Sequence, residues 1–434
     1  MAREGRAGGT SGDGGTSGDG DTPIPADPGP ARAGRRSDLI VIGAGVMGSW
    51  IAYWAQVGGG RRVTLLDAWG AGHPRATSGD ETRISRAAHG DDRLYTRWSR
   101  RSRDHWLRFQ EEWETALWVP CGCLWFAHRE DAFEARSAVV LQAEGVPHER
   151  LDPDELARRW PHLRLADGVR FALYEPEGGA LMARRGCRAT TSAFQRAGGT
   201  YAIAGVRPGS TDRGRLTDVV DVNGGRWQAD TFVFAAGPWL PRLFPDVLGD
   251  AIRVTKQDVL YFGAPAGDMR FDATAMPAWA DYDAAYWGIG SVEGRGFKVG
   301  PDRIGPIFDP SNGERVVDPE SVRLARAYLR RRFPNLADAP VVETRVCQYE
   351  STIDAHFLVD RHPEWENVWL VGGGSGHGYK HGPRMGEYVV ARLDGAREGD
   401  QDGPDEARFR IGPRVQGSAA RTGGDAMATT WDLF

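Results

Sequence analysis

Several features that mark large protein classes are absent from this sequence. Its 434 residues contain four cysteines, which is too few for a disulfide framework in a chain of this length. No apolar run approaches the ~20 residues needed to cross a bilayer, so no membrane span is expected. The net charge of −5 at pH 7 gives no general basic field for a nucleic-acid partner. We therefore expect a cytoplasmic protein without a membrane or nucleic-acid partner.

Cysteine spacing gives no metal-binding motif either. Cys121 and Cys123 are separated by one residue instead of the usual two, and no second cysteine or histidine pair lies nearby in the sequence. We therefore predict no metal site.

Large apolar residues are scarce at both ends of the chain. Residues 1–36 are rich in Gly, Ser, Asp, Thr and Pro, and from residue 397 onward Gly, Asp, Arg and Ala dominate again. Such segments cannot bury enough apolar surface to offset the entropy cost of ordering them. We predict a disordered tail over 1–36 and a mostly disordered tail over 397–434.

A dinucleotide-binding motif opens the region between the tails. Residues 38–43 form a short apolar run typical of a buried parallel strand, and a helix is predicted over 49–57. Between them, Gly43 allows a tight turn, Gly45 allows a pyrophosphate to approach the backbone, and Gly48 allows the helix to pack on the strand. The pyrophosphate would lie at the positive end of the helix.

A second predicted strand, residues 62–67, ends in an acid about 20 residues past the glycines. This acid, Asp67, is therefore the candidate partner for a ribose hydroxyl, and it argues against the additional phosphate of NADP. The motif alone leaves FAD and NAD as alternatives.

Two later apolar strands, 231–237 and 367–374, also end in glycine turns, so Gly237 and Gly374 are candidate cofactor-binding residues. Ligands of α/β sheets lie at the carboxyl ends of the strands. Because these strands come from distant parts of the chain, we predict an α/β fold with a discontinuous nucleotide-binding domain. The intervening segments must then form a second domain.

Several motifs occur in the same order as in one enzyme family. Together they resemble the monomeric sarcosine oxidase and N-methyltryptophan oxidase family of FAD-dependent amine oxidases, in the D-amino-acid-oxidase-like superfamily. The motifs are GAGVMG at 43–48, ETRISR at 81–86, YEPEGG at 174–179, GFKVG at 296–300, VCQY at 346–349, DAHF at 354–357 and GHGYK at 376–380. The resemblance implies an FAD-dependent oxidoreductase acting on CH–NH groups.

The resemblance also implies a domain organisation. A discontinuous Rossmann-type FAD-binding domain would be joined to a second, α+β substrate domain built on a mixed or antiparallel sheet. We predict the FAD-binding domain over 37–118, 175–238 and 344–396, and the substrate domain over 119–174 and 239–343.

Five residues take their predicted roles from the family motifs that they match. Cys347 would bond covalently to the flavin, and Lys298 would stabilise the negative charge that develops on oxygen as it is reduced. Arg86 and Lys380 would bind the substrate carboxylate, one as a fork and one as a point charge. Arg83 would lie beside the flavin as a further catalytic residue.

The sequence departs from the family on the substrate side. Asp302 stands where the sarcosine oxidases carry an active-site histidine, Trp287 stands where they carry a tyrosine, and their histidine-bearing stretch is Ser78–Glu81 here. We therefore expect Trp287 and Asp302 to contact a substrate other than sarcosine, an amine with an additional cationic or hydroxylated group.

The predicted reaction is oxidation of a C–N bond in a small N-substituted or cyclic amino acid or related amine. The products would be an imine and, with O2 as electron acceptor, hydrogen peroxide. Alternatives are an amine or imino-acid dehydrogenase, or a ring-aromatising oxidase, of the same fold. A non-catalytic flavin-binding protein and an NAD-dependent dehydrogenase are alternatives from other classes.

Overall fold

The computed structural model describes residues 36–165, 168–395 and 406–414. Most of the two predicted tails lies outside these residues. A short part of the predicted C-terminal tail is described, and it packs on the fold: η5 (Glu406–Phe409) ends in Phe409, which is fully buried. None of the helices in these ranges is long and apolar enough to cross a membrane.

A parallel sheet forms around the strand predicted at the start of the glycine motif. β1 (Ser37–Ile42) pairs in parallel with β2 (Val63–Asp67) and with β14 (Arg226–Phe234). Parallel pairing continues to β9 (Thr200–Ile203) beyond β2 and to β21 (Val368–Gly372) beyond β14. Antiparallel strands extend this sheet: β10 (Val206–Pro208), β13 (Asp218–Asp221) and β20 (Leu358–Arg361).

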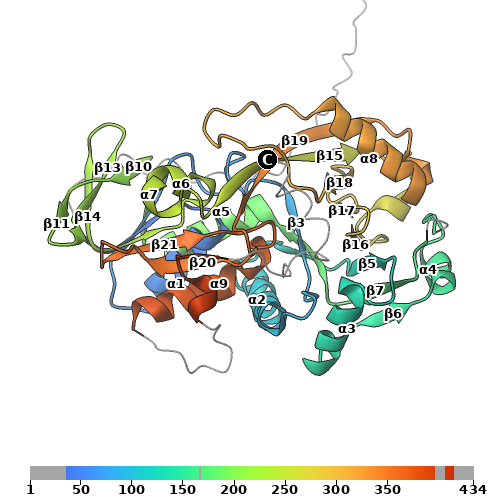
Figure 1. Ribbon diagram of the computed structural model, residues 1–434, viewed down its shortest axis with the longest axis horizontal. Coiled ribbons are helices and arrows are strands. Elements are labelled where there is room, and N and C mark those ends of the chain that lie inside the picture. The colour runs from blue at the N-terminus through green and yellow to red at the C-terminus, as the bar shows by residue number, and fades with distance from the viewer. Residues whose placement is uncertain (1–35, 166–167, 396–405, 415–434) are drawn as a thin grey trace, which may run out of the picture. The chain divides into compact units, whose positions relative to one another are not determined.

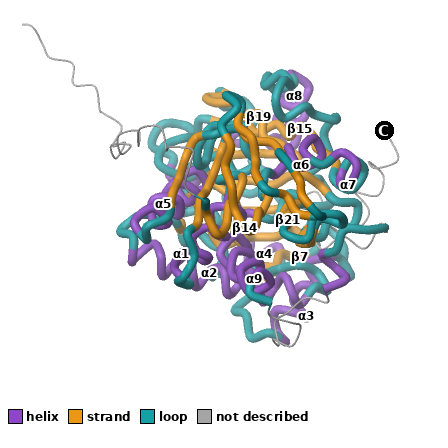
Figure 2. Tube along the Cα trace, turned by 90° about the vertical axis from the view of Figure 1, so that its left-hand side faces the viewer, coloured by secondary structure: helices purple, strands orange, loops and turns teal. Residues whose placement is uncertain are grey.

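Helices cover both faces of this sheet, because its strands are apolar on both sides. Leu39 and Val41 face a core shared with α1, α2, α5 and α9, whereas Ile40 and Ile42 face α6 and α7. Figures 1 and 2 show α1, α2 and α9 together on one side of the strands. The helices are α1 (Val46–Val57), α2 (Arg93–Glu112), α5 (Ala183–Arg196), α6 (Leu240–Leu243), α7 (Pro245–Leu248) and α9 (Gly382–Leu393).

A second large sheet is mixed. Its strands are antiparallel to their neighbours except for β16 and β5, which run parallel. In order across the sheet they are β19 (Val341–Ser351), β15 (Arg253–Phe262), β18 (Phe297–Pro301), β17 (Tyr286–Ile289), β16 (Ala278–Asp281), β5 (Cys123–Ala127), β7 (Phe171–Glu175) and β6 (Glu149–Leu151). α8 (Pro319–Arg332) packs on one face through Ala325 and Leu329. Two further helices accompany this second sheet, α3 (Phe133–Ala143) and α4 (Pro153–Arg159).

A small three-stranded sheet carries the arginine motif. β3 (Thr82–Ser85) and β4 (Trp118–Val119) pair with β8 (Gly179–Met182), and a separate hairpin is formed by β11 (Thr211–Asp212) and β12 (Arg215–Leu216). The predicted fold class, a discontinuous Rossmann-type α/β unit with a second unit on a mixed sheet, is confirmed. The domain boundaries stay a prediction.

The glycine turn has the close packing that its sequence predicts. α1 begins directly after Gly45, three residues before the predicted start. A Cβ on Gly48 would lie 1.8 Å from the carbonyl oxygen of Gly43, and Gly43 itself has φ +104°, so both positions exclude a side chain.

We expect Gly48→Ala to lower the free energy of unfolding by about 3 kcal/mol, because the added methyl must displace backbone. Gly45→Ala is the matched control: its φ is −71°, and its Cβ would meet nothing closer than the Ser78 Oγ at 3.4 Å. Urea unfolding of both variants measures the difference. Equal stability of the two variants would contradict the close helix–strand contact.

Candidate functional site

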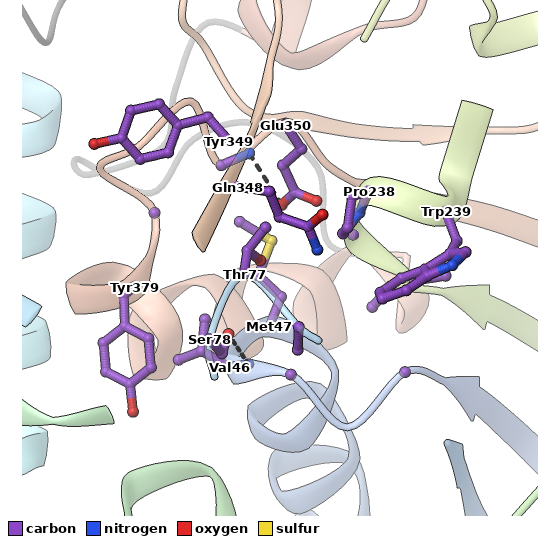
Figure 3. A pocket seen from close by; sticks show the side chains of 18 of the residues that line it. Val46, Met47, Thr77, Ser78, Pro238, Trp239, Gln348, Tyr349, Glu350 and Tyr379 are labelled. Carbon is purple, nitrogen blue, oxygen red and sulfur yellow. Dashed lines mark hydrogen bonds between the residues drawn. The ribbon is translucent and has the colours of Figure 1, made fainter. Parts of the chain in front are cut away.

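A cavity of about 600 Å³ lies where the carboxyl ends of the parallel strands face the second sheet. Its volume is within the range of about 300–1,000 Å³ that small-molecule and cofactor sites occupy. Of the 13 site residues predicted from the sequence, 11 line it: Gly43, Gly45, Asp67, Arg83, Arg86, Gly237, Trp287, Asp302, Cys347, Gly374 and Lys380. Gly48 packs beneath the turn instead, and Lys298 lies outside the lining. Figure 3 shows part of the wall.

Hydrogen bonds to Asp67 and Ser78 hold the glycine turn in place. Asp67 accepts hydrogen bonds from the backbone N–H of Ala44 at 2.7 Å and, through its other oxygen, from those of Trp69 and Gly70 at 2.8 and 2.7 Å. Ser78 accepts a hydrogen bond from Val46 N–H at 3.0 Å, which Figure 3 marks. Asp67 thus shapes the turn in addition to lining the cavity. Its predicted contact with a ribose stays a prediction.

A buried carboxylate organises the charges behind the cavity. Asp80 accepts from Lys298 Nζ at 2.5 Å, from Arg83 Nη1 at 2.6 Å and from the Tyr261 hydroxyl at 2.9 Å. Burial alone would raise the pKa of Asp80, but the adjacent Lys298 and Arg83 hold it well below its usual range. The sequence motifs give Asp80 no role beyond its place in the divergent stretch Ser78–Glu81.

The Lys298 ammonium lies beside the cavity wall without lining the cavity. It also donates to the Thr82 carbonyl at 2.7 Å, and it lies 5.2 Å from the centre of the Trp287 ring, which lines the cavity. Burial lowers the pKa of Lys298 to about 8, although Asp80 opposes this shift. The predicted role of Lys298 in oxygen reduction stays a prediction.

A thiol and a guanidinium meet at the cavity wall. Cys347 lies in β19, and its Sγ accepts a hydrogen bond from Arg83 Nη2 at 3.1 Å. The same nitrogen donates to the Thr77 carbonyl at 2.7 Å, so Arg83 is fixed from three sides by Asp80, Thr77 and Cys347. The guanidinium thus places a positive charge beside the sulfur at the cavity wall.

Two further cations, far apart in the sequence, line the same cavity. Arg86 is 7% exposed and Lys380 is 2% exposed. Arg86 donates to the Ala88 carbonyl and, at 3.3 Å, to the Tyr282 hydroxyl, and Lys380 Nζ donates to the His377 carbonyl at 2.9 Å. Within the described ranges no carboxylate lies in direct ion-pair contact with Arg86, although the buried Glu175 carboxyl interacts with it electrostatically. A buried guanidinium without a direct ion pair is suited to bind an anion.

The sequence motifs gave no role to two carboxyl residues that line the cavity, Asp221 and Glu350. Glu350 directly follows the Cys347–Tyr349 motif, is buried, and accepts a hydrogen bond from Gly374 N–H at 3.4 Å through Oε1. Its Oε2 is buried with no hydrogen-bond partner and lies where a Cβ on Gly237 would meet it at 2.8 Å. Burial raises the pKa of Glu350 to about 7.

These features fit a flavin dinucleotide. The turn leaves no room for side chains at Gly43 and Gly48, and Gly45, which precedes the first turn of α1, lines the cavity. The orphaned Oε2 of Glu350 offers a polar contact to a polar ring system, and Cys347 offers a nucleophile at the wall.

Comparison with known proteins places the chain in a sequence family. The profile described as "FAD dependent oxidoreductase" matches residues 38–392. The monomeric sarcosine oxidase of Bacillus sp. (strain B-0618) is 29% identical over 82% of this chain and 91% of its own length. The N-methyl-L-tryptophan oxidase of Salmonella arizonae is 26% identical over 81% of this chain and 93% of its own.

A solved structure has the same fold. The L-proline dehydrogenase from P. horikoshii superposes with a TM-score of 0.73 at 20% identity, covering 84% of this chain and 95% of that one. The family profile and the two sequence relatives confirm the resemblance that the sequence motifs indicate.

Glu350→Gln should change how stability depends on pH. A carboxyl with a pKa of about 7 when folded and 4.5 when unfolded keeps its proton in the folded state over that interval, so wild-type stability falls as pH rises from 4.5 to 7 and then levels off. The neutral amide of the variant removes this loss. The stability of the variant relative to wild type should therefore rise by about 3 kcal/mol between pH 4.5 and pH 8.

Urea unfolding at both pH values, with equal flavin content in the two proteins, measures this difference. A pH-independent difference between them would show that Glu350 ionises normally.

Proposed function

Because this chain belongs to the family of FAD-dependent oxidoreductases, we propose that it oxidises the C–N bond of a small amine that bears a carboxylate. The two hydrogens leave the carbon and the nitrogen, an imine forms, and O2 takes up the two electrons and two protons as hydrogen peroxide. One observation carries the proposal: the glycine turn, Cys347 and the buried cations Arg86 and Lys380 line a single cavity.

The residues that would hold FAD are divided between its two ends. The turn from Gly43 to Gly48 and Asp67 suit the pyrophosphate and ribose, and Gly237 and Gly374 line the cavity further along. Cys347 would form the covalent thioether, with Arg83 positioning its sulfur. Bound there, FAD supplies a two-electron acceptor for the C–H bond next to an amine nitrogen.

The cations would select and position the substrate. Arg86 can offer two N–H groups to a carboxylate, and Lys380 adds a point charge from a different segment of the chain. Oxidation requires a neutral amine, because a protonated nitrogen has no lone pair to support loss of hydride from carbon. Two buried cations nearby lower the pKa of the bound amine and so favour its neutral form.

Trp287 and Asp302 would set the substrate class. Both line the cavity, on β17 and directly after β18, and Asp302 is only 7% exposed. Asp302 would place a carboxylate beside the bound substrate, and a carboxylate attracts a cation or a hydroxyl group. This chemistry favours an amine with an additional cationic or hydroxylated group over sarcosine itself.

An oxygen-independent dehydrogenase of the same fold is the second candidate. It is favoured by the position of Lys298, whose ammonium is bonded to Asp80 and lies outside the cavity lining. A ring-aromatising oxidase is a variant of the main proposal in which the substrate is cyclic. A flavin protein without catalysis would predict a flavin that no amine reduces.

An anaerobic screen of N-methyl, cyclic and glycated amino acids tests the function directly. We expect at least one carboxylate-bearing amine to bleach the flavin absorption, and air to restore it with release of hydrogen peroxide. The matching amine without its carboxylate should bleach the flavin much more slowly. Bleaching that air does not reverse would favour the dehydrogenase, and no bleaching by any amine would contradict the proposal.

Cys347→Ser should convert a covalent flavin into a dissociable one, because serine lacks the thiolate nucleophile. Acid-precipitated wild-type protein should keep the yellow flavin in the pellet, whereas acid should release the variant's flavin into the supernatant. Cys121→Ser, at a thiol outside the cavity lining, is the matched control and should behave like wild type. Free FAD released from the wild-type protein would refute the covalent bond.

Lys298→Met should slow reoxidation of the reduced flavin by oxygen about 100-fold or more, since a fixed ammonium near the developing charge is removed. Reduction of the flavin by substrate should change far less, because Arg83 still pairs with Asp80. Lys256→Met, a lysine outside the cavity lining, is the control. Stopped-flow measurement separates the two half-reactions, and equal slowing of both would remove the assigned role of Lys298.

A further inference from the structure

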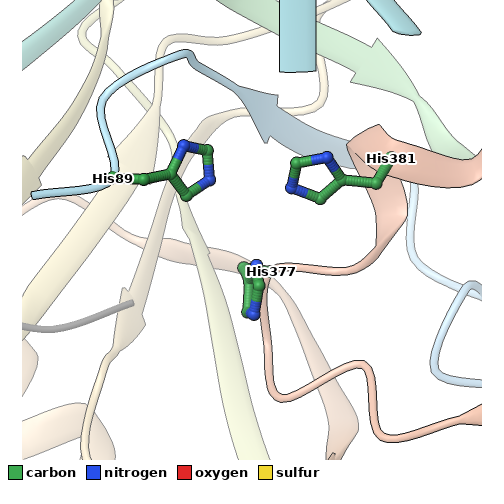
Figure 4. A group of neighbouring side chains, drawn as sticks. All are labelled: His89, His377 and His381. Carbon is green, nitrogen blue, oxygen red and sulfur yellow. The ribbon is translucent and has the colours of Figure 1, made fainter. Parts of the chain in front are cut away.

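Three buried histidines from distant segments form a cluster next to the cation pair. His89 lies in the loop between β3 and α2, and His377 and His381 lie before and at the end of η4 (Tyr379–His381). One potential ligand nitrogen of each ring lies within 4.8 Å of those of the other two. Figure 4 shows the rings of His89 and His381 facing each other, with His377 beside the gap between them.

Hydrogen bonds to backbone carbonyls determine which ring nitrogens of the cluster remain able to bind a ligand. The Nδ1–H of His89 donates to the Ala87 carbonyl at 2.9 Å, and the Nε2–H of His377 donates to the Ala355 carbonyl at 2.9 Å. The remaining nitrogen of a neutral imidazole carries a lone pair. Carbonyl groups orient metal-binding histidines in the same way, by accepting the proton of the nitrogen that does not bind.

Two of the rings have buried nitrogens that the protein leaves unsatisfied. The Nε2 of His89 and both ring nitrogens of His381 have no hydrogen-bond partner, although these side chains are 1% and 0% exposed. A buried ring nitrogen that takes part in no hydrogen bond can offer its lone pair to a metal ion.

We propose that His89, His377 and His381 bind a divalent transition metal ion of the zinc class through three imidazole nitrogens. Zn–N bonds of about 2.0–2.1 Å in a tetrahedral site place ligand nitrogens about 3.4 Å apart, so the cluster needs to contract by at most about 1.4 Å. Three ligands leave a fourth position for water or an anion. The positive charges of Arg86 and Lys380 oppose the ion itself and favour an anion as its fourth ligand.

The bound ion would join the two segments that carry the cation pair. Arg86 precedes His89 by three residues in the chain, and Lys380 lies between His377 and His381. Metal binding would therefore fix the separation of Arg86 and Lys380. The ion can enter from the cavity, because His377 lines it.

Metal titration of the tag-free, flavin-loaded protein tests the site, since a histidine tag would itself bind the ion. After treatment with a chelator, the protein is dialysed against Zn²⁺ or Co²⁺ and its metal content is measured. We expect one ion for each chain, visible Co²⁺ absorption beyond the flavin bands that Zn²⁺ abolishes, and a higher Tm with metal.

His381→Phe and His89→Phe should each lower metal affinity at least tenfold, because a ligand is lost while the aromatic ring is kept. His162→Phe is the matched control: His162 is buried, and both its ring nitrogens lack partners, but it stands apart from the cluster. This variant should bind metal like wild type.

Wild-type protein that binds no stoichiometric metal would overturn the proposal even if a variant failed to fold. Binding that survives unchanged in His381→Phe and His89→Phe would overturn it as well, because the ion would then lie elsewhere.

Discussion

The shared carboxylate of Asp80 is the constraint on which the rest of the site depends. It joins the segment before β3 to the second sheet through Lys298 and Tyr261, and it holds Arg83 against Cys347. Such a network contributes little to stability beyond what apolar residues would give, since desolvation offsets most of the attraction between buried charges. Removing one partner is costly, about 3–5 kcal/mol, because the others are then buried without compensation. The network therefore fixes positions more than it stabilises the fold.

Charge in the cavity follows from this arrangement. Asp80 is surrounded by two cations, so the Arg83 side of the site keeps a positive character, and Arg86 and Lys380 add two more positive charges. Burial raises the pKa of Glu350 to about 7, so at neutral pH this carboxyl carries only part of the negative charge of an ordinary glutamate. A cavity with this balance suits ligands that carry anionic groups, which both a dinucleotide and a carboxylate-bearing amine do.

Local patterns in the sequence predicted the parts of the site that depend on local geometry. The strand, glycine turn and helix could be identified because each glycine has a steric task, and the structure places a Cβ of Gly48 in conflict with Gly43. The family motifs located Cys347, Arg86 and Lys380, which line one cavity. Asp80 and Glu350 could not be assigned, because their roles come from partners such as Lys298, 218 residues away from Asp80. The histidine cluster was missed for the same reason: its members come from two segments and match no spacing motif.

Asp80 and Asp302, which stand at positions where the sequence departs from the family, affect the charge of the site in different ways. Asp80 neutralises the charge of Lys298 and keeps its ammonium outside the cavity lining, which weakens any electrostatic attraction that Lys298 exerts on a substrate carboxylate. Asp302 instead lines the cavity, as do Trp287, Arg86 and Lys380. Under the proposed function, the substrate carboxylate would lie against Arg86 and Lys380, and a second polar group of the substrate would lie near Asp302 and Trp287. A substrate with charge at both ends fits this separation better than one with a single carboxylate and a methyl group.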